Sequence, residues 1–386
     1  MMKIGIDLHN LSVDPIAWKK TGVQEVVFQI LLGLRHLRSH YPKSDLHFVA
    51  LPYLPKRSLA PNTTYQPAHL NNSKIVIDQI ASALNTPDSI LFDTQWPWES
   101  EAACEAKFYS IMPTLDWILI TGICDFRQIA CSSNHFRFKT RFAVLVHDLI
   151  SVKYPEVTGK GMNEWFQSAY LQSIKELACL TFSGSINTTL DCLQYFEIEQ
   201  PNSRSIENHF VRFPNFHRDA GTSDILERLI LNNEVYFLCI GTIEPRKNLS
   251  MVLEACALAA SLPNTYPFKI VFVGKEGWGQ PFAPAIEAIK SNVLFTGFIS
   301  DNDVQILLKN SRGLIFPSKY EGFGIPLFFA KNEGISIITC ANSSLPEVAE
   351  DAAIYVNVNS PQELAIAMLK LASQENTHAD FKGIVS

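Results

Sequence analysis

Short apolar runs rich in β-branched residues alternate with longer segments of helical periodicity along the first half of the chain. The runs that predict strands are residues 3–7, 47–51, 89–93, 143–147 and 180–183. Between them, residues 23–37 and 162–177 carry apolar side chains at helix spacing. Strands that alternate with helices predict a parallel sheet covered by helices. Residues 99–134 show no pattern that assigns an element.

A second series of the same kind follows the polar stretch 214–224, which is the best linker candidate in the chain. Its strand-like runs are residues 236–240, 269–273, 292–295, 313–316, 336–339 and 353–356. The chain of 386 residues also exceeds the roughly 250–300 residues at which a single core stops growing. We therefore predict an α/β protein with one doubly wound Rossmann-like lobe over residues 1–218 and another over 219–386. Two such lobes facing each other across a cleft bind ligands outside the carboxyl ends of their strands.

The composition excludes several classes of protein. A formal charge of −6 argues against nucleic-acid binding, which usually needs a basic surface. The eight cysteines form no Cys-x-x-Cys pair and have no His at metal-ligand spacing, which predicts buried thiols, a reducing compartment and no metal. The N-terminus lacks the apolar core of a signal peptide, and no stretch of about 18 apolar residues predicts a membrane span. We expect a cytoplasmic protein, at most peripherally associated with a membrane.

Two basic residues follow the first predicted strand of the second lobe, in the segment Gly-Thr-Ile-Glu-Pro-Arg-Lys-Asn over residues 241–248. Arg246 offers a planar fork to two oxygens and Lys247 a point charge, a combination that suits a diphosphate. The alternative interpretation is a solvated basic turn that opens the next helix. On either reading both residues lie on a loop, so their replacement should leave the fold intact.

A second cluster, residues 316–326, also stands between a predicted strand and a predicted helix. Gly322 and Gly324 let backbone N–H groups approach an anion, and Pro326 suits the first turn of a helix. The helix would then direct its positive end at a phosphate. Glu321 stands in the same loop and can accept hydrogen bonds from sugar hydroxyls. A glycine-rich turn alone is weak evidence, but two such loops at equivalent strand ends are stronger.

Two features of the first lobe have both a structural and a functional interpretation. His147 follows an apolar strand and is either a satisfied structural histidine or a functional one, and its neighbour Asp148 is equally suited to cap a helix or turn. Aromatic and basic residues alternate over residues 135–142. That pattern favours a strand with a solvated basic face, with an anchor for anionic lipid as the alternative.

These segments resemble the motifs of the family 4 (group 1) glycosyltransferases, a large group of retaining enzymes with the fold called GT-B. The likeness extends over nearly the whole chain. It is closest over residues 3–7, 21–24, 147–150, 154–156, 241–248, 297–303, 316–326, 343–348 and 351–353. The motifs are highly specific for the fold and moderately specific for activity.

The resemblance implies roles for individual residues. It implies that Arg246 and Lys247 neutralise the donor diphosphate and that Glu321 holds the transferred sugar. The implied catalytic set is His147, Glu321, Arg246 and Lys247, and the implied donor-binding set is Gly22, Gly241, Arg246, Lys247, Glu321, Gly322, Phe323, Gly324 and Ile325. His147 would touch the sugar from the first lobe, where Gly22 would let a loop close. No cofactor or metal is then required, because pre-placed cations stabilise the leaving diphosphate.

The implied function is transfer of a hexose or deoxyhexose, mannose or rhamnose by analogy, from a nucleotide diphosphate sugar to a cell-surface polysaccharide or glycolipid. The expected partners are the nucleotide sugar and a glycan or lipid-linked glycan acceptor, with peripheral contact at the inner face of the plasma membrane. The alternative is a catalytically impaired relative that serves as a scaffold or partner subunit. A nicotinamide-dependent oxidoreductase shares the sheet type but would carry Gly-x-Gly-x-x-Gly after a first strand, which is absent here.

The chain departs from the family pattern in two places. Relatives usually carry a second Glu eight residues after the first, where this chain has Phe329, and Glu333 lies one helical turn farther on. Relatives also continue into helices that cross back to the first lobe, whereas this sequence ends soon after the helix-like residues 361–372. We therefore expect reduced activity and weak nucleotide binding, with Phe329 packed among apolar neighbours.

Overall fold

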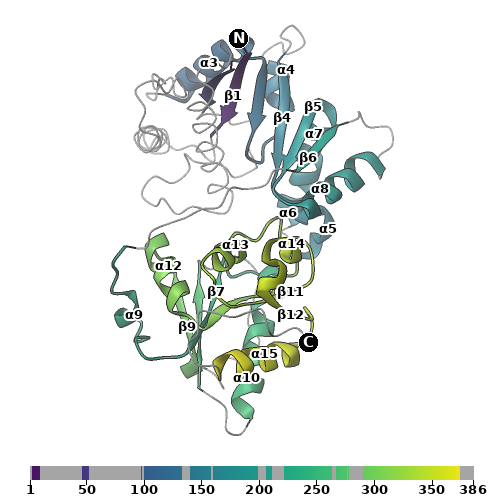
Figure 1. Ribbon diagram of the computed structural model, residues 1–386. Helices are drawn as coiled ribbons and strands as arrows, with labels where there is room; N and C mark the ends of the chain where they lie inside the picture. Colours follow the sequence, from purple (N-terminus) through teal and green to yellow (C-terminus); the bar gives the residue numbers. More distant parts are fainter. Residues whose placement is uncertain are drawn as a thin grey trace. The chain divides into compact units, whose positions relative to one another are not determined.

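The computed structural model describes residues 2–8, 46–51, 97, 100–132, 140–157, 160–198, 206–210, 221–262, 267–275, 277 and 290–373. The chain divides into two compact units, Met1–Pro214 and Asn215–Ser386 (Figure 1). The boundary predicted after residue 218 falls among residues 211–220, which lie outside the described residues. So do the predicted strand 89–93, the predicted helix 23–37 and Gly22.

Among the described residues, the N-terminal unit holds a parallel six-stranded sheet in the order β2-β1-β3-β4-β5-β6. Its strands are β1 (Met2–Asp7), β2 (Leu46–Leu51), β3 (Trp117–Ile120), β4 (Arg141–Val146), β5 (Ala178–Ser183) and β6 (Glu207–Phe210). The described helices are α3 (Glu101–Ile111), α4 (Arg127–Ser132), α5 (Ile150–Lys153), α6 (Lys160–Trp165), α7 (Gln172–Leu177) and α8 (Ile186–Leu193). A π-helical segment, Phe166–Leu171, joins α6 to α7, which confirms the helical periodicity over residues 162–177.

The sequence predicts β1 and β2 to within one residue and β5 to within two, and it misplaces both ends of β4. The strand predicted over residues 143–147 begins at Arg141 and ends at Val146, so that His147 is the first residue beyond it. β3 lies within the unassigned stretch 99–134, and β6 has no predicted counterpart. β6 is an edge strand with the sequence Glu-Asn-His-Phe, so it lacks the apolar pattern of a central strand.

The C-terminal unit holds a second parallel six-stranded sheet in the order β12-β11-β10-β7-β8-β9. Its strands are β7 (Tyr236–Ile240), β8 (Lys269–Val273), β9 (Val293–Gly297), β10 (Gly313–Phe316), β11 (Ile337–Cys340) and β12 (Ala353–Val356). The described helices are α9 (Ile225–Arg228), α10 (Leu249–Ser261), α12 (Asp301–Asn310), α13 (Ile325–Asn332), α14 (Leu345–Ala349) and α15 (Pro361–Ala372). The sequence predicts all six strands, with β9 and β11 each starting one residue later than expected.

The central strands of this unit are continuous apolar runs because both faces of the sheet are covered. β10 and β11 are buried at every residue, and β7 is buried except at its last residue. Helices α10 and α15 pack side by side (Figure 1). The side chains of Ser300 and Ser360 cap the N-termini of α12 and α15, where each accepts a backbone N–H. Among the described residues, no helix combines the length and apolar character needed to cross a membrane.

The strand order of the C-terminal unit reverses at β7. From β7 the chain runs outward through β8 and β9, and it then returns to β10 on the other side of β7. The loops after β7 and β10 therefore leave neighbouring strands at the same edge of the sheet, and such a reversal is where open α/β sheets bind ligands. Both sequence clusters of this unit lie on these two loops.

Candidate functional site

The loop after β7 begins at Gly241 and includes a short 3₁₀ helix, Pro245–Lys247. Asn248 follows in the left-handed conformation and leads into α10. A neighbouring loop after β8 supports this segment, since Ile243 donates a hydrogen bond to the Lys275 carbonyl at 3.0 Å. Gly274 makes this approach possible, because a Cβ atom there would lie 1.9 Å from the Gly241 carbonyl oxygen. The loop that carries the two basic residues is thus fixed to the adjacent strand end.

The loop after β10 carries Glu321 and ends at Gly324, which precedes α13. Gly324 has a φ of +97°, a conformation that favours glycine, and its carbonyl accepts hydrogen bonds from the Leu327 and Phe328 amides. Pro326 lies in the first turn of α13, as the sequence predicts. The Lys319 amide donates to the Arg246 carbonyl at 2.9 Å. The loops after β7 and β10 are therefore tied together through their backbones.

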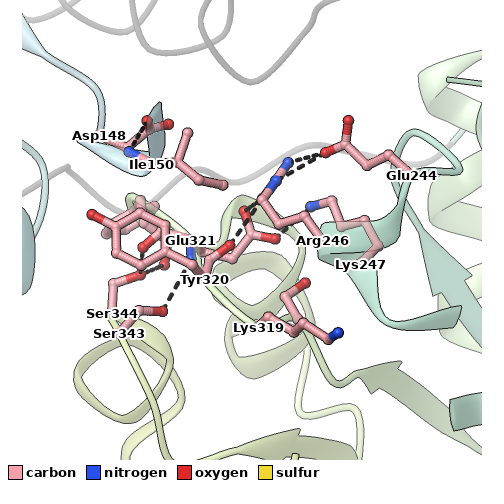
Figure 2. A network of polar contacts seen from close by, with 12 residues as sticks. Asp148, Ile150, Glu244, Arg246, Lys247, Lys319, Tyr320, Glu321, Ser343 and Ser344 are labelled. Atoms are coloured by element: carbon pink, nitrogen blue, oxygen red, sulfur yellow. Dashed lines mark hydrogen bonds and ion pairs between the residues drawn. The ribbon is translucent and has the colours of Figure 1, made fainter. Parts of the chain in front are cut away.

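The two loops bring Glu321, Arg246 and Lys247 into one ion cluster (Figure 2). Lys247 Nζ lies 2.6 Å from Glu321 Oε1, and Arg246 Nη1 lies 2.7 Å from Glu321 Oε2. The other edge of the guanidinium faces Glu244, with 2.9 Å between Arg246 Nε and Glu244 Oε1. Lys247 Nζ also stands 4.6 Å from the centre of the Phe316 ring. The sequence identified three members of this cluster and missed Glu244.

Burial and charge together determine the ionisation of this cluster. Glu321 is 8% exposed and Lys247 is 9% exposed. Burial alone would raise the pKa of the Glu321 carboxyl, but Arg246 and Lys247 outweigh it and lower that pKa to about 2. Burial lowers the pKa of the Lys247 ammonium, although the Glu321 carboxylate opposes this effect. Glu321 is therefore an ionised carboxylate with two cationic partners at neutral pH.

Phe329 and Glu333 lie where the sequence departs from the family pattern. Phe329 is on α13, half-buried against the hydrophobic core of the C-terminal unit, and its ring meets that of Phe328 edge-on. Glu333 lies just past the last residue of α13 and pairs with Lys309 of α12, with 3.1 Å between Nζ and Oε2. The carboxylate of Glu333 is thus already engaged by a neighbouring helix.

The residue predicted from the first lobe, His147, lies directly after β4. Its Nε2 atom is 2.7 Å from the carbonyl oxygen of Thr121, which can only accept, so Nε2 carries the proton. Burial lowers the pKa of His147, partly offset by that hydrogen bond and by Asp148. Asp148 accepts a hydrogen bond from the Ile150 amide at 3.0 Å, the turn-capping interaction that the sequence offered as one interpretation.

A buried carboxylate that the sequence did not single out supports the same strand ends. Asp7, at the end of β1, is fully buried and accepts hydrogen bonds from the amides of Thr121 and Gly122, each at 3.2 Å. In the aromatic and basic stretch, residues 135–139 lie outside the described residues. At the C-terminal end of the stretch, Phe142 is buried in β4, and the Arg141 guanidinium lies 5.4 Å from the centre of the Trp117 ring.

Comparison with known proteins finds a family match within the C-terminal unit. Residues 224–383 match the family model described as "Glycosyl transferases group 1". The C-terminal unit resembles a group 1 glycosyltransferase domain. The matched residues include Glu244, Arg246, Lys247 and Glu321.

Two similar proteins extend the likeness. The chain is 28% identical over 149 residues, 38% of its length, to O-antigen chain mannosyltransferase B of Escherichia coli. It is 24% identical over 294 residues, 73% of its length, to the serotype-specific mannosyltransferase WbdA of the same species. These matches cover 39% and 35% of the two relatives, so the chain spans little more than a third of their length.

Among solved structures, Anabaena HepE in complex with UDP-glucose has a TM-score of 0.61 at 15% identity. The match covers 97% of this chain and 90% of HepE. A likeness at this identity establishes the fold alone. The protein has the two-lobe α/β fold of the GT-B glycosyltransferases.

Proposed function

We propose that the protein is a retaining, metal-independent glycosyltransferase that moves a hexose or deoxyhexose from a nucleotide diphosphate sugar. The observation that carries this proposal is the cluster of Arg246, Lys247 and Glu321, where the loops after β7 and β10 are joined. The cluster lies within residues 224–383, which match the group 1 glycosyltransferases.

The chemistry of the reaction suits these side chains. Breaking a glycosyl–phosphate bond leaves negative charge on the diphosphate and positive character at the sugar carbon. Arg246 and Lys247 stabilise the leaving diphosphate, and the N-terminal end of α13 adds backbone N–H groups and a favourable dipole. The ionised Glu321 accepts hydrogen bonds from the sugar. These fixed cations supply the charge stabilisation that a metal ion supplies in other transferases, so turnover should withstand a chelator.

The donor and acceptor are proposed from the relatives. Both curated relatives are named mannosyltransferases, which favours a mannose-type donor, and O-antigen chain synthesis favours a cell-surface polysaccharide or glycolipid acceptor. Such an acceptor would place the protein at the cytoplasmic face of the membrane. Phe329 offers no carboxylate to a ribose, so we propose weak nucleotide affinity held mainly by phosphate and base contacts.

A calorimetric titration of the protein with GDP, UDP and dTDP tests this function. We expect one of the three to bind and the Lys247→Ala variant to bind none. Lys269→Ala is the matched control, because Lys269 lies at the amino end of β8 and pairs with Glu234. Transfer from the corresponding nucleotide sugar should continue in EDTA. A wild-type protein that binds none of these nucleotides at millimolar concentration would favour the scaffold alternative.

A further inference from the structure

Three consecutive side chains after β11 hold the backbone of the loop that carries Glu321. Ser343 Oγ accepts a hydrogen bond from the Glu321 amide at 3.0 Å. Ser344 Oγ lies 2.9 Å from the carbonyl oxygens of both Glu321 and Phe323, between which its single hydroxyl proton is shared. The Asn342 side-chain amide donates to the carbonyls of Ser318 and Lys319. Figure 2 shows Ser343 and Ser344 beside this loop.

The contacts come from the sheet itself, because β10 and β11 are parallel neighbours whose carboxyl ends lie together. Thr339 of β11 donates to the Phe316 carbonyl at 2.7 Å, just before the two loops begin. Ser344 is fully buried, so its hydroxyl has no access to water and depends on these two carbonyls. The loop after β11 therefore packs directly against the loop after β10.

Ser343 adopts a backbone conformation that serine disfavours. Its φ is +47°, in the left-handed region that glycine enters at no steric cost. Such strain persists only where the surroundings impose it, and it concentrates at functional sites. Here the strained residue supplies the acceptor for the amide of Glu321, and the carboxylate of that same residue meets Arg246 and Lys247.

We propose that Ser343 and Ser344, with Asn342, are positioning residues that set the location of the Glu321 carboxylate for the sugar of the donor. The proposal rests on the function proposed above for Glu321. The side chains of these three residues contact the loop backbone, and in the proposed function Glu321, rather than any of the three, contacts the sugar. Losing one hydroxyl should shift the carboxylate relative to the donor without removing any group that binds nucleotide.

The decisive comparison is between Ser343→Ala and Ser343→Gly. Both variants remove the acceptor of the Glu321 amide, but only glycine relieves the strain at φ +47°. We expect Ser343→Gly to unfold at a higher urea concentration than Ser343→Ala, and both to lose at least tenfold in kcat/KM for transfer from GDP-mannose or UDP-glucose, whichever the wild type uses. If Ser343 had a purely structural role, Ser343→Gly would recover both the stability and the transfer activity that Ser343→Ala loses. That result would overturn the proposal.

Ser360→Ala is the matched control, because Ser360 caps α15, where its side chain accepts a hydrogen bond from the Glu363 amide. It removes one serine hydroxyl and one hydrogen bond to a backbone amide, as Ser343→Ala does. Hydrogen exchange at the Glu321 amide should accelerate in Ser343→Ala and stay unchanged in Ser360→Ala. Unchanged exchange in Ser343→Ala would also overturn the proposal. Hydrogen exchange reports on the contact between Ser343 and the Glu321 amide whether or not nucleotide binds. Failure of the proposed function is detected by a different measurement, in which the wild-type protein binds no nucleotide.

Discussion

The two sheets present different chemistry at their carboxyl edges. In the C-terminal unit, four charged side chains gather on the loops after β7 and β10, with Glu321 bonded to two cations. In the N-terminal unit, the edge holds a half-buried imidazole, His147, bonded to a carbonyl, and a buried Asp7 bonded to two amides. The first edge gathers cations that suit an anionic ligand, whereas the second places an imidazole beside carboxylates that already accept backbone hydrogen bonds. The contrast teaches that two sheets of the same type can present different chemistry at their carboxyl edges, depending on which side chains follow their strands.

The largest expected effect comes from removing Lys247, the buried cation that pairs with Glu321. Lys247→Ala leaves the buried Glu321 with Arg246 as its remaining partner in the cluster, and breaking a buried ion pair costs about 3–5 kcal/mol. Urea unfolding should show this loss, and transfer activity should fall below about a tenth, which corresponds to roughly 1.4 kcal/mol of barrier. Unchanged stability would mean that the cluster is solvated and that the two edges differ less than we argue.

This expectation differs from the sequence-based one. The sequence placed Arg246 and Lys247 on a loop and predicted that their replacement would leave the fold intact. The structure places both in a 3₁₀ helix with Lys247 buried, so its replacement affects stability as well as charge.

The next effect is the pH dependence of Glu321. Its folded pKa of about 2 lies below its ordinary value of about 4.3, so its contribution to stability is complete above that value and is lost as pH falls toward 2. The difference in urea midpoint between wild type and Glu321→Gln should therefore shrink from pH 5 to pH 3. A constant difference would contradict the lowered pKa.

A smaller effect tests the position where Phe329 replaces the family's carboxylate. Phe329→Glu should tighten nucleotide binding by up to about 1.5–3 kcal/mol, the strength of a hydrogen bond to a charged group. It should also lower stability, because Phe329 packs against the core. Titration with the nucleotide that binds wild type measures the gain. Glu333→Ala is the control, since Glu333 pairs with Lys309, and loss of binding in that variant would assign the ribose contact to Glu333 instead.

The smallest expected effect belongs to His147, at the carboxyl edge of the N-terminal sheet. His147→Ala should lower kcat about tenfold, roughly 1.4 kcal/mol, while nucleotide affinity stays the same. Because burial lowers the pKa of His147, an NMR titration should show it neutral at pH 7, with a midpoint below 6.5. Weakened nucleotide binding in this variant would remove the distinction between the two edges.

The fold was largely predictable because strands covered on both faces are continuous apolar runs. β7, β10 and β11 are such strands, and each was found from the sequence. β6 was missed because an edge strand with Glu207, Asn208 and His209 has no apolar pattern. β3 was missed because its four residues stand between polar turns in a stretch without helical periodicity.

The site was only partly predictable, for a different reason. Arg246, Lys247 and Glu321 were identified because charged residues after strand ends carry a local signal. Glu244 stood in the same segment, but nothing local distinguishes a carboxylate that engages Arg246 from one exposed to water. The positioning role of Ser343 depends on a contact between residues 22 positions apart in sequence, which only the pairing of β10 with β11 creates.

Gly274 has a consequence for how this protein can change. A Cβ atom there would lie 1.9 Å from the Gly241 carbonyl oxygen, and the backbone of Gly274 has a φ of +152°. Any side chain would push the Gly241 peptide away and carry the start of the Lys247 loop with it. In a library that varies this position, every survivor selected for transfer should therefore retain glycine. Efforts to alter donor choice should vary other residues, because position 274 accepts only glycine.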